Sequence, residues 1–598
     1  MRKKSKIHKI LSSSKTRSIL LSHRFQTVKE FVEKNFYSIL LVSLIIGISI
    51  SHILYVIKTY QYPQWDEHPY LDYAVNVLPL IKHPTISIWN DILHITKFRQ
   101  PLYSVIIAIV LSIFGTIHAY KTILILNGIF YSLTIIGTYF LAKHFMNRFL
   151  SLLAAYSFAF YGFPLFYLHF TVSETATTTF IILSLLFLMK SDIFKKNIYT
   201  ILFSIFASFS LLVRWESIIF LIGPSLWIFL FYIKFVLKQN KLNVIRIVST
   251  VKPMLLIIFF FVIPTLLLYY VPNFNYFKQY VEENRMYGPI WAPGSIKNPF
   301  SPSSLIWYSN VLAQQTIFFW LLFIAGFLLS VSKIRKNGFL VITFLTPYIV
   351  LTIGGVWKDD RFIVPIYPYM AILSITCIDM IKLKKIKYLL IGSVIVIGFL
   401  NFLGASWGIG PMKFSVTGNR TTVPHSILVP MPIGHPRRVW FAPISWPPRE
   451  NEGNSDLILK TILEDNKNEK RPNVLLTFSI PQIEGPLYKT VLYEQRDIID
   501  LRALWGFNAD DYEILFNRIK NADYILIKEE GAFDDQFDGK LDLLQTFNET
   551  IRSSNVRLPM AYQKLKEVNI PFDESRVYIY KRIRSLSQED IETFEEIF

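Results

Sequence analysis

The sequence contains a single cysteine, Cys377, among its 598 residues. One thiol cannot form a disulfide within the chain, and it cannot supply the several thiolates of a structural zinc site. Cys377 lies inside the apolar run PYMAILSITCIDMI, where packing is enough to explain it. Any exported part of the chain must therefore be stabilised without disulfides.

Acidic residues are scarce in the first two thirds of the chain. Residues 1–404 carry 38 Lys and Arg against 14 Asp and Glu, a formal charge of +24, whereas residues 405–598 carry 24 against 29, a charge of −5. The change of sign marks a boundary near residue 404. The basic residues stand between apolar runs and do not follow one polar face, which argues against nucleic acid as a partner.

Long uncharged apolar runs are what the sequence has in excess. Hydrophobic residues make up 52% and aromatic residues 16% of the chain, and the mean hydropathy is +0.37. The first run, residues 36–57, carries no charge and covers the roughly 20 helical residues that cross a hydrocarbon core about 30 Å thick. Similar runs recur to about Leu403, so the sequence predicts a polytopic α-helical protein of the cell membrane. We expect the first run to be a retained anchor, because it lacks a convincing cleavage site.

Basic connectors predict the orientation. The tail before the first run, residues 1–35, is rich in Lys and Arg, and the positive-inside rule places it in the cytoplasm. Basic connectors are expected on that side, and connectors with acidic or mixed charge on the external (periplasmic or extracellular) side. The basic ones are 143–148, 190–197, 234–252, 333–337 and 382–387; the others are 169–174, 213–216, 272–304 and 358–362.

One apolar segment, residues 101–115, decides the number of spans. If it crossed the membrane, every later basic connector would become external, which violates the positive-inside rule. We therefore predict that it rests on, or dips into, the external membrane surface as a juxtamembrane helix of the first external loop, residues 58–119. About eleven spans remain, at 36–57, 120–142, 149–168, 173–189, 198–213, 217–233, 254–271, 306–330, 338–356, 362–381 and 388–404.

The chain after residue 404 changes in character. Residues 405–454 are rich in proline and aromatic residues, and we interpret them as a linker. Residues 455–598 alternate helical and strand patterns, which predicts an external α/β domain. Its predicted helices lie at 456–467 and 510–522, and its predicted strands at 473–479, 523–530 and 576–583. Two Asn-x-Thr triplets begin at Asn419 and Asn548, although triplets this short also arise by chance.

Ten of the 14 acidic residues before residue 405 fall on the external side in this topology. Acidic residues contribute little to orientation, so the skew indicates a site on that side. Several of them stand at span ends beside a cation, where the alternative interpretation is interfacial anchoring. The ten are Asp66, Glu67, Asp72, Asp91, Glu174, Glu216, Glu282, Glu283, Asp359 and Asp360.

Adjacent carboxylates at Asp66 and Glu67, in the stretch WDEHPYLDY, are the candidate catalytic residues. A carboxylate held just above the bilayer can act as a general base, while its neighbour positions an acceptor or a divalent cation. The structural alternative is a helix N-cap at Asp66 with Glu67 in the first turn. The same loop holds FRQPLYSVIIA, in which Arg99 and Tyr103 open an amphipathic helix. An arginine at this depth suits a lipid phosphate.

Four motifs together resemble the GT-C superfamily of membrane glycosyltransferases. WDEHPY resembles the Asp-Glu of the family's first external loop, and RQPLY its Arg/His-Pro-Pro-Leu-Tyr, with Gln100 as a departure. SET at 173–175 resembles its second acidic position, and DDRFIVPIYP at 359–368 its Asp-Arg-Tyr followed by prolines. The motifs follow the family's order over residues 36–404, which would then be the transmembrane catalytic domain. Within the superfamily, the motifs resemble the branch that contains protein O-mannosyltransferases, aminoarabinose transferases acting on lipid A and related bacterial transferases.

The resemblance implies an inverting transfer of a hexose or pentose from a polyprenyl-phosphate donor. Asp66 would be the base, Glu67 and Glu174 would orient the acceptor or a metal, and Arg99, Arg214 and Arg361 would be candidates for the lipid phosphate. Asp66, Glu67 and Glu174 are the candidates for a divalent metal cation. The full set of substrate-binding candidates is His68, Tyr70, Arg99, Tyr103, Glu174, Arg214, Glu216, Lys358, Asp359, Asp360 and Arg361.

The expected partners are the lipid-linked sugar donor, a lipid, glycan or protein acceptor, and membrane lipids. A lipid-linked donor agrees with external carboxylates, because nucleotide sugars are made in the cytoplasm. A polyprenyl-lipid or other small-molecule transporter or flippase is the main alternative, since many spans with charges at their ends also suit it. A non-catalytic scaffold or receptor would need no acidic cluster in the first loop.

Overall fold

The computed structural model describes the chain in segments. They are 14–60, 67–96, 99–116, 118–237, 244–279, 281–282, 300–316, 318–354, 358, 360–409, 448, 453–466, 471–478, 483, 487, 498–503, 512–529, 542–552, 558–571 and 574–597. The description covers the backbone alone at 14–34, 67–68, 244–250, 303, 310, 314–315, 360, 503, 542–545, 558–559 and 594–597.

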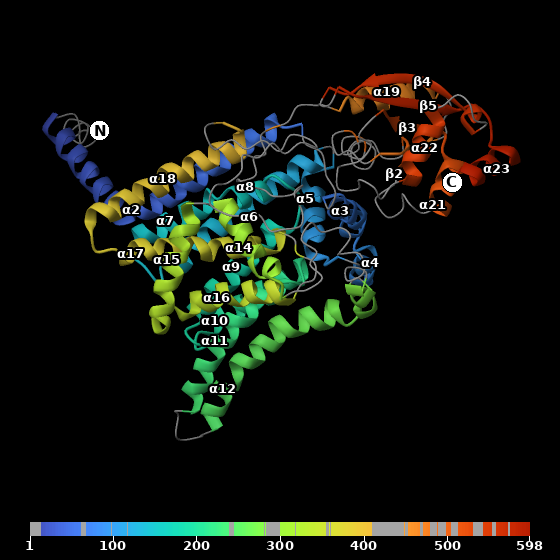
Figure 1. Ribbon diagram of the computed structural model, residues 1–598. Coiled ribbons are helices and arrows are strands. Elements are labelled where there is room, and N and C mark those ends of the chain that lie inside the picture. Colours follow the sequence, from blue (N-terminus) through green and yellow to red (C-terminus); the bar gives the residue numbers. More distant parts are fainter. Residues whose placement is uncertain are drawn as a thin grey trace, which may run out of the picture.

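The part of the chain before residue 408 is a bundle of helices (Figure 1). Apolar runs form helices here because hydrocarbon cannot satisfy backbone polar groups, and the helix satisfies them internally. In chain order they are α2 (Ser14–Lys58), α6 (Ala119–Ala142), α7 (Arg148–Ala159), α8 (Gly162–Leu168), α9 (Glu174–Lys190), α10 (Asn197–Val213), α11 (Ser217–Leu237), α12 (Val244–Ile257) continued by the π-helix η1 (Ile258–Tyr270), α14 (Pro302–Thr316), α15 (Phe318–Ser332), α16 (Ile334–Gly354), the 3₁₀-helix η2 (Asp360–Ile366), α17 (Tyr367–Met380) and α18 (Lys384–Trp407).

Seven helices in the described part of the chain are long and apolar enough to cross a membrane, and two bent helix pairs raise this number to nine. The chain is therefore a multi-pass membrane protein. The other two predicted spans, α9 and α10, have 17 residues each. At 1.5 Å per residue they are about 25 Å long, a little short of a hydrocarbon core. The predicted total of eleven spans stays a prediction.

Some predicted elements differ from the observed ones. The span predicted at 149–168 is α7 followed by α8, bent by 61°. Gly162 and Pro164 lie in the first turn of α8, and a proline lacks the N–H that would continue the preceding helix. The span predicted at 306–330 is likewise the bent pair of α14 and α15. One 45-residue helix, α2, runs from Ser14 through the end of the basic tail and the first span, and the predicted boundary between tail and span stays a prediction.

In its described residues, the first loop holds three helices, α3 (Glu67–Lys82), α4 (Ile88–Thr96) and α5 (Leu102–Phe114). The loop starts and finishes at one end of the bundle, because its flanking helices α2 and α6 run antiparallel. Ser49 lies beside Ser132, and the Lys121 ammonium donates to the Ile57 carbonyl at 3.4 Å. The helices between them therefore add no net crossing of the bundle.

Helix α5 has 13 residues, about 20 Å, which is too short for a span. It buries Tyr103, Ile107 and Leu111 against the bundle and leaves Ile113 and Phe114 exposed. An exposed apolar edge of this kind suits a helix that rests at a membrane surface.

Close approach of two helix backbones brings α15 against α17. A Cβ added at Gly326 would stand 1.9 Å from the carbonyl oxygen of Leu373. Only glycine allows this approach, and small residues at such contacts are a common feature of helix packing in membranes.

The chain beyond α18 forms a five-stranded sheet in the order β2-β1-β3-β5-β4 (Figure 1). β1 pairs in parallel with β2 and β3, and β5 pairs antiparallel with β3 and β4. Leu475 stands opposite Ile525, and Leu526 opposite Ile579. The strands are β1 (Asn473–Leu476), β2 (Asp500–Ala503), β3 (Tyr524–Lys528), β4 (Tyr562–Asn569) and β5 (Arg576–Arg582).

Helices cover both faces of this sheet. α19 packs on one face through Ile458 and Ile462. α21 and α22 pack on the other, through residues that include Leu515 and Phe547. Alternate residues of a strand point to opposite faces, which is why Leu475 belongs to one core and Leu476 to the other. The helices of this part are α19 (Ser455–Asp465), α21 (Tyr512–Asn521), α22 (Asp542–Arg552) and α23 (Gln588–Ile597).

The predicted α/β character of this part is confirmed, although β2, β4, α22 and α23 were not predicted. The predicted linker, 405–454, lies mostly outside the described residues, and the predicted domain boundaries stay predictions. Asn548, which begins one Asn-x-Thr triplet, is 5% exposed and donates from Nδ2 to the Thr477 carbonyl at 3.2 Å. Its amide is therefore engaged inside the folded sheet domain. Asn419 lies outside the described residues.

A hydrogen-bonded contact joins the sheet domain to the bundle. The Tyr60 hydroxyl, just beyond α2, donates to the two carboxylate oxygens of Asp456 in α19 at 3.0 and 3.1 Å. The sheet domain thus lies beside the end of the bundle where the first loop starts.

Candidate functional site

Helix α3 begins at Glu67, the residue that follows Asp66 in the sequence. Asp66 lies outside the described residues, and the structure does not describe the side chains of Glu67 and His68. Their predicted roles therefore stay predictions. The helix itself is described, and its first turns carry Tyr70 towards the other site candidates.

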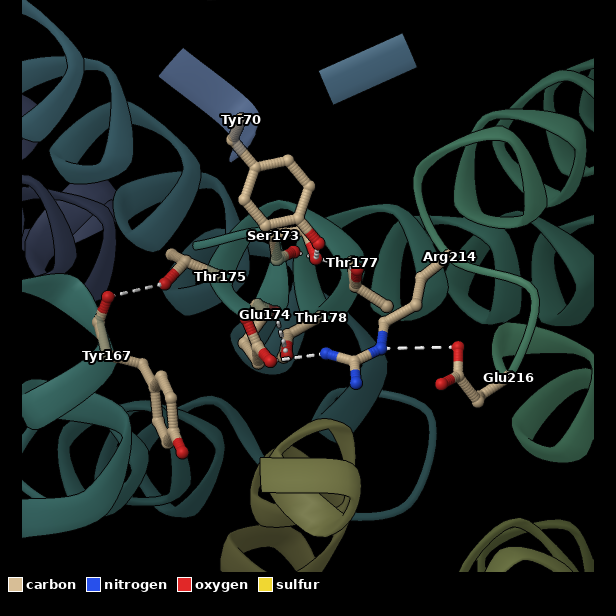
Figure 2. A network of polar contacts seen from close by, with 9 residues as sticks. All are labelled: Tyr70, Tyr167, Ser173, Glu174, Thr175, Thr177, Thr178, Arg214 and Glu216. Atoms are coloured by element: carbon tan, nitrogen blue, oxygen red, sulfur yellow. Dashed lines mark hydrogen bonds and ion pairs between the residues drawn. The ribbon is translucent and has the colours of Figure 1, made fainter. Parts of the chain in front are cut away.

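Glu174 is the first residue of α9 and is 3% exposed. A carboxylate is favoured there because the first turn of a helix has free N–H groups and a positive dipole end. The hydroxyls of two threonines that follow donate to backbone carbonyls one turn earlier. Thr177 donates to the Ser173 carbonyl at 2.7 Å, and Thr178 donates to the Glu174 carbonyl at 2.8 Å (Figure 2). These internal bonds let a polar helix start lie in the interior.

Arg214 directly follows α10 and pairs with two carboxylates (Figure 2). Its Nη1 binds Oε1 of Glu174, and its Nε donates to Oε2 of Glu216 at 3.2 Å. The exposed fractions of the three side chains are 13%, 3% and 11% in the order Arg214, Glu174, Glu216. Burial lowers the pKa of Arg214, but Glu216 and Glu174 raise it more, so the net pKa is raised well above its ordinary value. The three groups form a buried ionic cluster with one cation and two anions.

Tyr70 connects α3 to this cluster. Its hydroxyl lies 2.8 Å from the hydroxyl of Ser173, the residue before Glu174 (Figure 2). The guanidinium of Arg99 lies 4.8 Å from the centroid of the Tyr70 ring, within the range of a cation–π contact. Tyr103 meets the same ring edge-on, with 5.2 Å between the centroids.

The predicted binding residue Tyr103 is fully buried, and its hydroxyl donates to Oδ1 of Asn127 in α6 at 3.0 Å. Asn127 in turn donates to the Phe170 carbonyl. Tyr103 thus belongs to the packing beneath Tyr70. Ser173 and Asn127 were not predicted from the sequence, because a buried serine or asparagine in an apolar helix gives no signal until its partner is known.

The segment after α16 brings Arg361 to the cluster through an aromatic ring. Phe362 lies beneath two guanidiniums, with its centroid 5.1 Å from that of Arg214 and 5.9 Å from that of Arg361. The charge of Arg361 also lowers the pKa of Arg214. Asp359 and the side chain of Asp360 lie outside the described residues.

Lys358 does not join the cluster. It is fully buried, its ammonium donates to the carbonyls of Leu351 and Thr352 near the end of α16, and it lies 5.4 Å from the Tyr308 ring centroid. A cation is favoured beside the free carbonyls of a helix C-terminus. Burial lowers the pKa of Lys358 to about 8. The structure thus places this predicted binding residue as a helix cap.

The described structure therefore brings together seven predicted candidates from five parts of the sequence: Tyr70, Arg99, Tyr103, Glu174, Arg214, Glu216 and Arg361. Within the described residues, no three His, Cys, Asp or Glu side chains come close enough to hold a metal ion. Glu174 keeps one oxygen, Oε2, buried without a hydrogen bond, and it is the described member of the predicted metal-binding group.

Comparison with known proteins gives structural likenesses. No family model and no curated protein sequence matches this chain. ArnT from Cupriavidus metallidurans bound to undecaprenyl phosphate aligns over 93% of this chain and 100% of its own, with a TM-score of 0.55 and 12% identity. The apo form of that ArnT aligns over 92% and 98%, with a TM-score of 0.51 and 10% identity. The oligosaccharyltransferase AglB from Archaeoglobus fulgidus, in complex with an inhibitory peptide and a dolichol-phosphate, aligns over 84% and 70%, with a TM-score of 0.48 and 11% identity. At these identities, the likeness to ArnT concerns the fold.

Proposed function

We propose that this chain, which has the GT-C fold of membrane glycosyltransferases, transfers a hexose or pentose from a polyprenyl-phosphate donor to an acceptor at the external face of the membrane. The predicted orientation, with the amino-terminus in the cytoplasm, belongs to this proposal. ArnT, the structural neighbour with 100% coverage, was seen with undecaprenyl phosphate, which supports a donor of the same lipid class.

One observation carries the proposal. A buried cluster of Glu174, Arg214 and Glu216 lies at the end of the bundle, and Tyr70 ties it to the helix that begins directly after Asp66. Buried charges are costly and are retained where they pair or perform chemistry. Interfacial anchoring does not account for charges that are this deeply buried.

In the proposed reaction, the carboxylate of Asp66 takes the proton from an acceptor hydroxyl. The hydroxyl oxygen forms a bond to the anomeric carbon while the bond from that carbon to the phosphate oxygen breaks. The polyprenyl phosphate leaves with the electron pair, and a single displacement inverts the configuration. Glu67 and Glu174 orient the acceptor, while Arg99 and Arg361 stabilise the charge that develops on the phosphate.

A divalent cation fits this proposal only in part. Oε2 of Glu174 could be one ligand, and Asp66 and Glu67 would be the others. When bound, such a cation would stabilise negative charge on the leaving phosphate. The acid–base step proposed for Asp66 does not require it.

The test is transfer by the purified chain in lipid nanodiscs, with polyprenyl-phosphate sugars as donors. Mass spectrometry of envelope glycans with and without the chain in cells would identify donor and acceptor. Asp66→Asn should lower the transfer rate by about 10²- to 10⁴-fold, the usual contribution of a general base. Asp379→Asn, in α17 near its ion-pair partner Lys387 at the other end of the bundle, is the control and should keep activity.

The transporter alternative predicts a different result when the purified chain is reconstituted into sealed lipid vesicles with the same donors. A flippase would move the polyprenyl lipid between leaflets and form no glycosylated product. Lipid movement without transfer would therefore reject the glycosyltransferase proposal. Full transfer activity in the folded Asp66→Asn variant would reject Asp66 as the base and leave the enzyme class intact.

A further inference from the structure

Arg214 was predicted to bind the phosphate of the donor, but its surroundings indicate another role. The guanidinium is held on two sides by carboxylates, Glu174 at Nη1 and Glu216 at Nε (Figure 2). We propose that Arg214 is a positioning residue, which fixes the carboxylate of Glu174 towards the acceptor and does not serve as the cation for the donor phosphate. This inference rests on the proposed glycosyltransferase function.

The charge count of the cluster favours this role. Two carboxylates and one guanidinium carry a net charge of −1, and all three side chains are at least 87% buried. The neighbouring cations Arg99 and Arg361 are not part of this count, and they are the ones proposed to attract the phosphate. Charges interact more strongly in the interior than in water, so an incoming phosphate would meet net repulsion from this cluster. A guanidinium that binds phosphate well presents its planar fork to the phosphate oxygens. Two of the three nitrogens of the Arg214 guanidinium, Nη1 and Nε, are already bound to carboxylates.

We call the Arg214 guanidinium with its two carboxylates, Glu174 and Glu216, the clamp. The local backbone explains how these three residues come together. Arg214 directly follows the last residue of α10 and has an extended conformation, φ −158° and ψ 126°, and α11 begins three residues later. Arg214 and Glu216 therefore belong to one tight connection, whereas Glu174 comes from the start of α9, 40 residues earlier. The clamp fastens the α10–α11 connection to the amino-terminus of α9. Removal of Arg214 would release the side chain of Glu174 and leave two buried carboxylates without their cation.

The clamp leaves one oxygen of Glu174 available. Oε1 accepts from Arg214, whereas Oε2 is buried and has no hydrogen-bond partner. A buried carboxylate oxygen without a partner is costly, and a donor group of the substrate would satisfy it. Acceptors that present a hydroxyl or amine are therefore favoured over acceptors that present only an anionic group at this position.

The experiment separates the two roles through a KM-against-kcat comparison. Arg214→Lys keeps the charge and loses the two-sided geometry, so it is expected to fold and to lower kcat by about 10- to 100-fold, as misplacement of a substrate-orienting group does. Its KM for the polyprenyl-phosphate sugar should stay within about twofold of the wild type, since uniform binding of the donor is not lost. Arg335→Lys, an exposed arginine at the start of α16, is the matched control and should change neither constant.

A second variant and a binding measurement complete the test. Glu216→Gln keeps the Arg214–Glu174 pair, and we expect a smaller loss of kcat, with donor KM again unchanged. Binding of undecaprenyl phosphate to the purified chain should be equal in wild type and Arg214→Lys. A tenfold weaker binding, or a tenfold higher donor KM, would show that Arg214 is the phosphate cation and overturn the inference. A wild-type chain without any sugar transfer would instead reject the proposed function itself.

Discussion

The hydroxyl of Tyr70 lies 2.8 Å from the hydroxyl of Ser173, and this hydrogen bond joins the helix after Asp66 to the start of the helix that begins with Glu174. Both residues are buried, at 7% and 0% exposure. The contact brings the first loop to the ionic cluster of the bundle. The relative position of the acidic residues on α3 and α9 therefore depends on it.

Tyr70→Phe and Ser173→Ala remove the same hydrogen bond and should have coupled effects. Each is expected to lower the transfer rate by about 10-fold, and the double variant should be little worse than either one, with a coupling of about 1 kcal/mol. Steady-state transfer kinetics of the three variants measure this coupling. Ser184→Ala, a buried serine further along α9 that donates to the Phe203 carbonyl, is the control. Independent, multiplying losses would contradict the proposed link.

Because Lys358 is buried, we expect the free energy of unfolding of the chain to depend on pH. Its pKa in the folded chain is about 8, below the ordinary 10.5, because burial disfavours the charged form. Between these two values the unfolded chain binds a proton that the folded chain does not bind. The free energy of unfolding therefore rises with pH over this window, by up to about 3 kcal/mol. Thermal unfolding in detergent should show a wild-type midpoint that climbs relative to Lys358→Met between pH 8 and 10. Parallel curves would contradict this account.

We expect α23, the helix of the sheet domain that contains Asp590, to lose stability in acid. The ion pair with Arg584 and bonds from Ser587 lower its pKa from 3.8 to about 2, against the opposing effect of burial. Ser587 N–H donates to Asp590 at 2.7 Å, and Asp590 N–H donates back to Ser587 Oγ at 3.2 Å, as in a capping box. The stabilisation is present above about pH 4 and is lost as the pH falls towards 2, with a size of about 2 kcal/mol.

Hydrogen exchange of the α23 amides measures this helix. At pH 7, Asp590→Asn should exchange roughly 30-fold faster than the wild type, the factor that corresponds to about 2 kcal/mol. The difference should shrink as the pH falls through about 2 and vanish below it, where the wild-type carboxyl is protonated and uncharged like the amide of the variant. Glu592→Gln, an exposed residue of the same helix, should leave exchange unchanged. Equal exchange in Asp590→Asn would show that the cap is not important for this helix.

Gly326→Ala tests the close contact between α15 and α17. The added methyl would overlap the Leu373 carbonyl, so the two helices must separate, at a cost of about 1–3 kcal/mol. The thermal unfolding midpoint in detergent should fall. Gly392→Ala in α18 has no atom within 4 Å of the new methyl and should leave the midpoint unchanged or slightly higher. An equal response of the two variants would contradict the packing seen here.

The sequence predicts the helical spans well because a charge-free run has few alternatives in a membrane. It does not predict the break between α7 and α8, although Gly162 and Pro164 are a visible signal of a helix interruption. β4 escapes prediction for a physical reason: it is an edge strand whose middle residues, including Lys564 and Lys566, are exposed. Such strands lack the continuous buried apolar run that marks β3.

The site is predictable in its charged members and not in their pairing. Charge patterns identify Glu174, Arg214 and Glu216 as candidates, because charged residues at the ends of apolar runs are costly. Sequence alone cannot show that Arg214 is shared by both carboxylates or that Lys358 caps a helix, since these contacts join residues that only the fold brings together. Asp66 itself stays a prediction.

The Lys121 ammonium donates to the Ile57 carbonyl, so the segment that holds α3, α4 and α5 begins and ends at neighbouring positions in the bundle. This segment is therefore an insert between α2 and α6. A short linker could replace that insert, and α2 and α6 would still reach each other as neighbours. The scaffold and the segment that carries the paired acids can thus be altered separately, and related chains could exchange this segment while they keep the same frame. The segment between Ile57 and Lys121 is therefore the part of the chain in which related proteins could differ in substrate preference.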